Sequence, residues 1–231
     1  MIPKIIHYCW FGQKPMNRVG LRCLRSWELL CPDYEIRRWD ESNFDLDAHP
    51  FLKWCHEQGL WAYLSDIARL MVVHDYGGIY FDTDVELIKR PDAYLGHEAF
   101  FGFETPQYVA TGLGFGAVPR HIAVKAMLEE YYSLRPAADG SWPTIGCPRL
   151  NTLALEKLGM VPNGQLQRVS GVLILPQSSM NPFDPITGRL KIQSDTISIH
   201  WYSMSALSPW LRIRNRLGRP WHRLLATFKK C

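Results

Sequence analysis

Apolar and polar positions follow one another along the chain in blocks that predict strands and helices in alternation. Residues 2–10 form an isoleucine-rich run typical of a buried strand, and residues 17–31 carry apolar side chains at helical spacing up to Pro32. Residues 34–39 alternate as a second strand. A strand, a helix and a strand at this spacing form a βαβ unit, which favours a parallel sheet.

The same pattern extends over the rest of the chain. The clearest helix covers residues 60–75, where apolar side chains recur on one face and Gly77-Gly78 provides a stop. Further strands are predicted at 79–81, 99–103, 113–118, 172–175 and 196–199, and further helices at 121–134 and 149–158. No repeat or linker divides the chain, so we expect one α/β domain over residues 1–208 and a separate segment over 209–231.

Two carboxylates follow the short strand at 79–81. Asp82 and Asp84 lie where this buried strand ends, and at a separation of ~4 Å their repulsion is ~4 kcal/mol for an effective dielectric of ~20. A hard divalent cation such as Mg²⁺ or Mn²⁺ removes that cost. In an extended strand the two residues are ~6.6 Å apart, so both can bind one ion only if the chain bends. We expect Asp84 to ligate the metal and Asp82 to act through water or a ligand hydroxyl; a solvated turn is the alternative.

Five other residues are candidates for the same site. Asp66 and Arg69 are helical neighbours that converge with Ser65, and an arginine can hold a phosphate while an aspartate accepts from a hydroxyl. An exposed helical ion pair is the alternative for them. Trp10, at the end of the first strand, could stack on a nucleobase or simply pack in the core. His200 could supply a nitrogen ligand, or it could be structural.

Composition places few further limits on function. Of the 231 residues 47% are hydrophobic and 21% charged, as in ordinary globular proteins, and the six cysteines show no Cys-x-x-Cys spacing. We therefore expect reduced thiols, several of them buried, and no zinc site. The start of the chain does not resemble a signal peptide, and no run of 18 apolar residues predicts a membrane span.

Positive charge gathers at the end of the chain. Seven of the 26 basic residues follow Asp195, the last acidic residue, so the preceding part is slightly acidic. In residues 209–231 these cations alternate with tryptophan, leucine and phenylalanine, a pattern typical of a basic amphipathic helix on an anionic membrane. A helix packed on the domain and a nucleic-acid contact are the alternatives; we expect the membrane and no nucleic acid.

Four blocks in order resemble the glycosyltransferases with a DxD sugar-binding region. This family includes fungal α-mannosyltransferases and bacterial capsule and lipopolysaccharide transferases, and it is distantly similar to the glucosyltransferase domains of clostridial toxins. The similar blocks are residues 2–12, residues 26–39, residues 64–70 and residues 77–85, and a fifth, Ser198-Ile199-His200-Trp201, is also similar.

The resemblance implies a GT-A fold, a single α/β domain with a Rossmann-like mixed sheet flanked by helices. It further implies a UDP- or GDP-sugar donor, Mn²⁺ or Mg²⁺, and transfer of a hexose-type sugar with retention. The acceptor would be a lipid-linked or surface glycan, in surface polysaccharide biosynthesis. The enzyme would be cytoplasmic and peripheral on the inner membrane face. Within segment 111–116, which corresponds to a loop near the sugar, the residue that orients the sugar stays open.

By position, the resemblance assigns three sets of residues. The catalytic residues would be Asp82, Asp84 and Arg69; the metal ligands Asp84, Asp82 and His200; and the nucleotide-sugar contacts Trp10, Ser65, Asp66, Arg69, Tyr80, Asp82 and Thr83.

Two other function classes compete with a transferase. A phosphatase of the Asp-x-Asp-x-Thr type would use the first aspartate as nucleophile, but Glu86 occupies the threonine position. A non-catalytic carbohydrate- or nucleotide-binding protein would leave the buried aspartate pair without a role.

Overall fold

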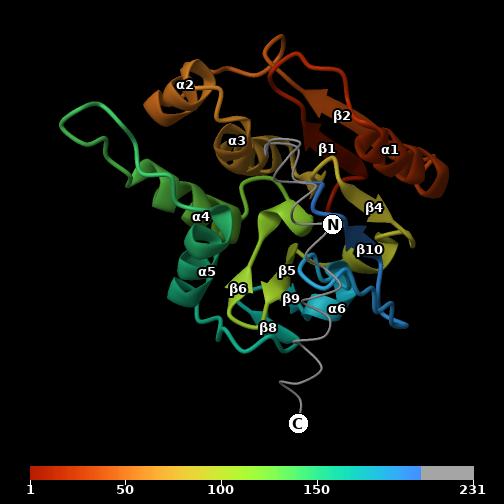
Figure 1. Cartoon of the computed structure of the whole chain (residues 1–231). Coiled ribbons are helices and arrows are strands. Elements are labelled where there is room, and N and C mark those ends of the chain that lie inside the picture. Colours follow the sequence, from red (N-terminus) through yellow and green to blue (C-terminus); the bar gives the residue numbers. More distant parts are fainter. Residues whose placement is uncertain (204–231) are drawn as a thin grey trace.

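The computed structural model describes residues 1–203 (Figure 1). Its helices are α1 (Arg18–Leu30), α2 (Pro50–Glu57), α3 (Trp61–Tyr76), α4 (Ile122–Tyr132), α5 (Cys147–Lys157) and α6 (Gln177–Met180), with 3₁₀ turns at Asp92–Tyr94 and Thr111–Leu113. Its strands are β1 (Ile5–Cys9), β2 (Glu35–Trp39), β3 (Gly78–Tyr80), β4 (Val85–Leu87), β5 (Ala99–Thr105), β6 (Tyr108–Val109), β7 (Phe115–Ala117), β8 (Gln167–Val169), β9 (Val172–Leu175) and β10 (Ser198–His200).

The predicted mixed sheet is confirmed. Its strands run in the order β2-β1-β3-β7-β5-β9-β8, with β6 paired to β5. β1 is parallel to β2 and β3, while β7 is antiparallel to both β3 and β5, so β5 points the same way as β1 and β3. β9 is parallel to β5. The carboxyl ends of β1, β3, β5 and β9 therefore share one edge, where open α/β sheets bind ligands.

Two apolar clusters lie on opposite faces of this sheet. One joins the sheet to α2, α3, α4 and α5 and includes Phe101, Phe103 and Phe115. The other joins it to α1, α6 and the separate β4–β10 pair and includes Trp27 and Phe81. The result is a layered α/β arrangement in which β4 lies next to α1, and Trp27 of α1 donates to the carbonyl of Val85 on β4 (Figure 1).

Local sequence explains why the main elements begin and end where they do. Asn17 caps α1 by accepting from the backbone N–H of Gly20 at 2.9 Å, a standard N-cap contact. α3 ends at Gly77, whose φ of 64° suits glycine. A Cβ atom on Gly78 would lie 2.8 Å from the carbonyl oxygen of Ile5, so the close pairing of β3 with β1 also requires glycine.

The structure also contains elements that the sequence pattern did not predict, namely α2, β4, β6, β8 and α6. In α1, fewer apolar side chains are buried than their helical spacing predicted. Gly20, Cys23 and Trp27 are buried there, whereas Leu21 is 56% exposed. The five cysteines within the described residues are free and buried, as predicted. Residues 209–231, the predicted amphipathic segment, lie outside the described residues.

Candidate functional site

A tight turn brings the two aspartates together at the end of β3. The backbone N–H of Val85 donates to the carbonyl of Asp82 at 2.9 Å, so the chain reverses between β3 and β4. This is the bend that two carboxylates on one strand need if they are to meet. One ligand atom from each of Asp82, Asp84 and His200 lies within 4.8 Å of the others.

The carboxylate of Asp84 is bound by residues at the end of the described chain, His200 and Ser203. β10 pairs with β4 so that His200 lies opposite Val85, and His200 Nε2 is 3.1 Å from Asp84 Oδ1. The backbone N–H of Ser203 donates to Asp84 Oδ2 at 2.7 Å. Burial acts to raise the pKa of Asp84, but His200 and the Ser203 N–H outweigh it and hold the pKa below its usual value. Asp84 in turn raises the pKa of His200 against the effect of burial.

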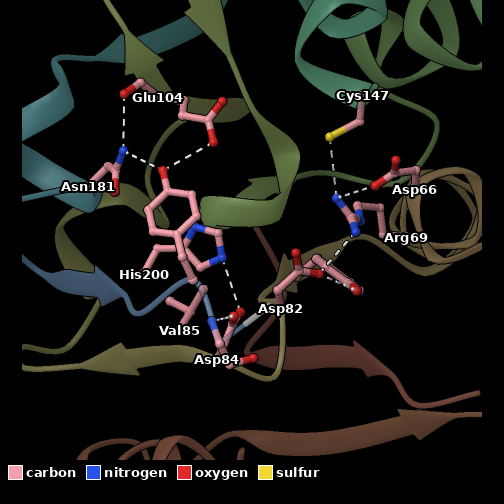
Figure 2. Close-up of polar contacts among 12 residues, drawn as sticks. Asp66, Arg69, Asp82, Asp84, Val85, Glu104, Cys147, Asn181 and His200 are labelled. Carbon is pink, nitrogen blue, oxygen red and sulfur yellow. Dashed lines mark hydrogen bonds and ion pairs between the residues drawn. The ribbon is translucent and has the colours of Figure 1, made fainter. Parts of the chain in front are cut away.

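Asp82 is held from the opposite side by Arg69 on α3. The guanidinium is 4% exposed and lies 3.0 Å from Asp82 Oδ1 and 2.9 Å from Asp66 Oδ1 (Figure 2). Tyr80 donates from its hydroxyl to the same Oδ1 at 2.9 Å, and its ring lies beneath the guanidinium. Burial acts to lower the pKa of Arg69, but the two carboxylates keep it well above the ordinary value. The predicted convergence of Asp66 and Arg69 is thus a buried, bridged pair and not an exposed one.

The side chain of Asp66, on α3, contacts the first residue of α5. It accepts hydrogen bonds from the backbone and thiol of Cys147, the first residue of that helix. Burial raises the pKa of Asp66 to about 6, although the nearby Arg69 charge opposes this shift. Cys147 Sγ is also 3.6 Å from Arg69 Nη1. The ion pair therefore ties α3 to α5 as well as to the aspartate turn.

The segment 111–114 packs directly on this ion pair. A Cβ atom on Gly112 would lie 2.6 Å from Asp82 Oδ2, so the backbone can approach the carboxylate only because residue 112 is glycine. Thr111 Oγ1 accepts from Asn151 Nδ2 at 3.0 Å. Sequence reasoning flagged this segment but missed Asn151, which comes from the fully buried face of α5.

The remaining predicted residues lie around the same edge with fewer contacts. Trp10 follows β1, is half-buried, and donates from Nε1 to the carbonyl of Lys14 at 2.7 Å. Thr83 is half-buried within the aspartate turn. Ser65 is half-buried beside Asp66, and within residues 1–203 it makes no hydrogen bond to Arg69, so this part of the predicted convergence is not seen.

A second polar group, which the sequence did not single out, lies on the His200 side of the site. The hydroxyl of Tyr202 donates to Glu104 Oε1 at 3.1 Å and accepts from Asn181 Nδ2 at 2.8 Å. The rings of Tyr202 and His200 have their centroids 4.0 Å apart. Figure 2 shows Glu104 and Asn181 on this side, across from Arg69 and Cys147. The signal that could have identified Glu104 is an acidic residue directly after an apolar strand, the same signal that identified Asp82.

The donor atoms suit a divalent metal. Two carboxylates and one imidazole within 4.8 Å offer oxygen and nitrogen ligands, a set compatible with Mn²⁺ or Mg²⁺. Asp84 Oδ1 and His200 Nε2 are 3.1 Å apart and face each other, so both atoms could turn to the same cation. The residues present therefore fit such an ion.

Comparison with known proteins identifies the region that contains the aspartate turn. Residues 19–101 match the family model described as a glycosyltransferase sugar-binding region containing a DXD motif. The chain carries a DXD sugar-binding region. The predicted resemblance is therefore confirmed, and the DXD residues of this region are Asp82, Thr83 and Asp84.

Curated relatives of the sugar-binding region are named as transferases. The chain is 32% identical over 126 residues to inositol phosphoceramide mannosyltransferase 2 of Schizosaccharomyces pombe, covering 52% of this chain and 36% of the relative. It is 30% identical over 152 residues to a human α-1,4-N-acetylglucosaminyltransferase, covering 62% and 42%. The chain thus spans well under half the length of these relatives. The matches agree with the predicted enzyme class, a glycosyltransferase.

The fold agrees with the GT-A prediction. The PaToxG glycosyltransferase structure superposes with a TM-score of 0.52 at 16% sequence identity, covering 68% of this chain and 69% of that one. At this identity the likeness concerns the fold alone. Within residues 1–203, no helix has the length and apolarity needed to cross a bilayer.

Proposed function

We propose that the protein is a metal-dependent retaining glycosyltransferase. It would move a hexose-type sugar from a UDP- or GDP-sugar to a hydroxyl of a glycan acceptor. The observation that carries the proposal is the cluster of Asp82, Asp84 and His200 at the carboxyl edge of the sheet, within a chain that has a DXD sugar-binding region. The Asp66–Arg69 pair next to this cluster supports it.

Each side of the site would have its own task. Asp84 and His200 would hold Mn²⁺ or Mg²⁺, which when bound neutralises the diphosphate leaving group. Arg69 and Tyr80 both donate to Asp82 Oδ1, so they fix this carboxylate and leave Oδ2 for the metal, a water or a donor hydroxyl. Trp10, Ser65, Asp66 and Thr83 would line the nucleotide and sugar, with Trp10 on the base.

Retention follows from where the bonds form and break. The bond between the anomeric carbon and the diphosphate oxygen breaks, and the acceptor oxygen bonds to the same face of that carbon. The proton of the acceptor hydroxyl passes to the departing phosphate oxygen. The positive charge that develops on the sugar is stabilised by the fixed carboxylates around it.

The acceptor and the location of the enzyme extend the proposal beyond residues 1–203. We propose that residues 1–208 form the catalytic domain and that 209–231 hold it on the inner face of a membrane. There it would act on a lipid-linked glycan for a surface polysaccharide such as capsule or lipopolysaccharide. Deleting residues 209–231 should release the protein from anionic vesicles in a co-sedimentation assay, and unchanged binding would contradict the membrane assignment.

Calorimetric titration tests the central claim. Wild-type protein should bind UDP or GDP only when Mn²⁺ is present, and Asp84→Asn should lose this binding while still showing a cooperative thermal unfolding transition. Asp47→Asn is the matched control, since the side chain of Asp47 is 77% exposed and remote from the turn. Metal-independent binding, or full binding by Asp84→Asn, would contradict the proposal. A panel of nucleotide sugars, screened for metal-dependent hydrolysis, then identifies the donor.

A further inference from the structure

Glu104 occupies the same kind of position as Asp82. It lies near the carboxyl end of β5, and β5 points the same way as β3, so both acidic residues reach the ligand-binding edge of the sheet. Side chains alternate along β5, and Phe101 and Phe103 pack in the apolar cluster between the sheet and α2–α5. By this alternation Glu104 projects from the opposite face of β5, where its carboxylate contacts Tyr202, beside the aspartate turn.

The carboxylate of Glu104 is only partly satisfied. It is half-buried, and Oε1 accepts one hydrogen bond, from the neutral hydroxyl of Tyr202. Within residues 1–203 no lysine, arginine or histidine nitrogen lies within 4.0 Å of it, and Oε2 has no hydrogen-bond donor. Oε2 is therefore open to accept a hydrogen bond from a ligand hydroxyl.

The contacts of Glu104 connect it with the metal ligands. Tyr202 joins the two, because its hydroxyl donates to Glu104 while its ring packs at a tilt against His200, which contacts Asp84. Asn181 fixes the arrangement by donating to both the Tyr202 hydroxyl and the Glu104 backbone carbonyl. Tyr202 adopts a φ of 47°, a strained value for an aromatic residue. Strain of this kind persists where the surrounding structure requires it, often at functional sites.

The negative charge of Glu104 acts electrostatically on groups on both sides of the site. It contributes to raising the pKa of His200 on one side and that of Cys147, which contacts Arg69, on the other.

We infer that Glu104 accepts a hydroxyl group of the donor sugar and thereby selects which nucleotide sugar is bound. Tyr202 and Asn181 are positioning residues for this carboxylate. The inference rests on the proposed function and adds a residue that neither the DXD motif nor residues 19–101 contain. The same chemistry could serve a hydroxyl of the acceptor. We commit to the donor because Tyr202 connects Glu104 to the metal ligands that would hold the donor diphosphate.

The test compares binding of a nucleoside diphosphate with binding of the matching nucleotide sugar. Calorimetry with Mn²⁺ is run on wild type, Glu104→Gln and Glu104→Ala, using UDP, GDP and the UDP- and GDP-hexoses. Glu129→Gln is the matched control, because its side chain is 62% exposed on α4. Loss of a hydrogen bond to a charged group corresponds to a roughly 10- to 100-fold loss of affinity. We expect Glu104→Gln to lose this much for the nucleotide sugar and less than about twofold for the nucleoside diphosphate.

Two further measurements separate binding from support of the fold. Tyr202→Phe keeps the ring against His200 and removes the hydroxyl. It should therefore lower the affinity for the nucleotide sugar and leave the affinity for the nucleoside diphosphate unchanged. A deoxy-donor that lacks the recognised hydroxyl should bind wild type and Glu104→Gln equally.

Several results would overturn the inference. Equal losses for diphosphate and nucleotide sugar would show a structural role for Glu104. An unchanged affinity for the nucleotide sugar, with a raised KM for the acceptor, would assign the hydroxyl to the acceptor instead. If wild type binds no nucleotide with Mn²⁺, the proposed function itself fails and the inference falls with it. If wild type binds and Glu104→Gln is unaffected, the inference fails alone.

Discussion

Replacing Arg69 with methionine should destabilise the protein far more than replacing an exposed arginine. The guanidinium lies about 3 Å from two carboxylates, 2.9 Å from Asp66 and 3.0 Å from Asp82, with 4% of the side chain exposed. At ~3 Å and an effective dielectric of ~20, each contact contributes a gross attraction of ~5 kcal/mol, most of it offset by desolvation. Methionine has a similar length but leaves both acidic side chains without a cation. Removing one partner of a buried ion pair lowers the free energy of unfolding by about 3–5 kcal/mol.

Urea unfolding at pH 7 measures this loss as a change in the free energy of unfolding. Arg25→Met is the matched control, because Arg25 is 67% exposed and its pair with Glu28 at 3.3 Å should contribute less than about 1 kcal/mol. Arg69→Lys keeps the charge but has no planar fork to reach both carboxylates, so we expect an intermediate loss.

The pH dependence of Arg69→Met provides an independent check. Burial already raises the pKa of Asp66 to about 6 against the opposing charge of Arg69, so removing the arginine should raise it further. The folded variant then holds a proton that the unfolded chain releases above its usual pKa near 3.8. Stability of the variant should therefore rise as the pH falls from 7 to 5, and its deficit relative to wild type should shrink. A deficit below about 1 kcal/mol at pH 7, or one that stays constant with pH, would refute this reasoning.

Three other predictions concern the fold and the site. Gly112→Ala should weaken Mn²⁺-dependent nucleotide binding at least tenfold, because its Cβ would displace the Asp82 carboxylate, whereas Gly96→Ala meets nothing within 4 Å and should bind normally in the same titration. Burial lowers the pKa of His7 from 6.5 to about 4, so wild type should lose about 3 kcal/mol of stability between pH 6.5 and 4 that His7→Gln does not lose; parallel urea curves would contradict this. Trp27→Phe removes a buried hydrogen bond of 2.8 Å to the start of β4 and should cost about 1–3 kcal/mol in thermal or urea unfolding; a cost near zero would contradict it.

The sequence predicted those parts of the fold that depend on local patterns. The β1–α1–β2 unit and α3 were found because their apolar residues recur regularly and because Pro32 and Gly77 mark the ends of the two helices. β4 was missed because it has three residues and its partner, β10, lies more than 100 residues further along the chain. The apolar pattern of a short stretch of sequence carries no information about a pairing with such a distant strand.

The site divides in the same way. Asp66, Arg69 and Asp82 could be placed together because α3 leads directly into β3, so proximity in sequence becomes proximity in space. Asn151 and Glu104 could not be placed there from the sequence. Each is far from the aspartate turn along the chain and comes close to it only through the tertiary arrangement of α5 and β5. The position of Glu104 at the end of an apolar strand was nonetheless a usable signal, since the same rule identified Asp82.

The two aspartates of the DXD turn are controlled by different parts of the chain, and this gives their proposed division of labour a physical basis. Asp82 takes its hydrogen bonds from Arg69 and Tyr80, both within 13 residues of it. Asp84 takes its contacts from His200 and Ser203, which belong to the last described strand and the residues after it. Loosening residues 200–203 should therefore weaken metal binding first, while loosening α3 should first disturb contacts to the sugar or ribose. Since Tyr202 packs against His200 and also donates to Glu104, a ligand that fixes Glu104 would restrict the motion of the Asp84 side as well. Donor sugar and metal should accordingly bind with positive coupling through a single aromatic ring.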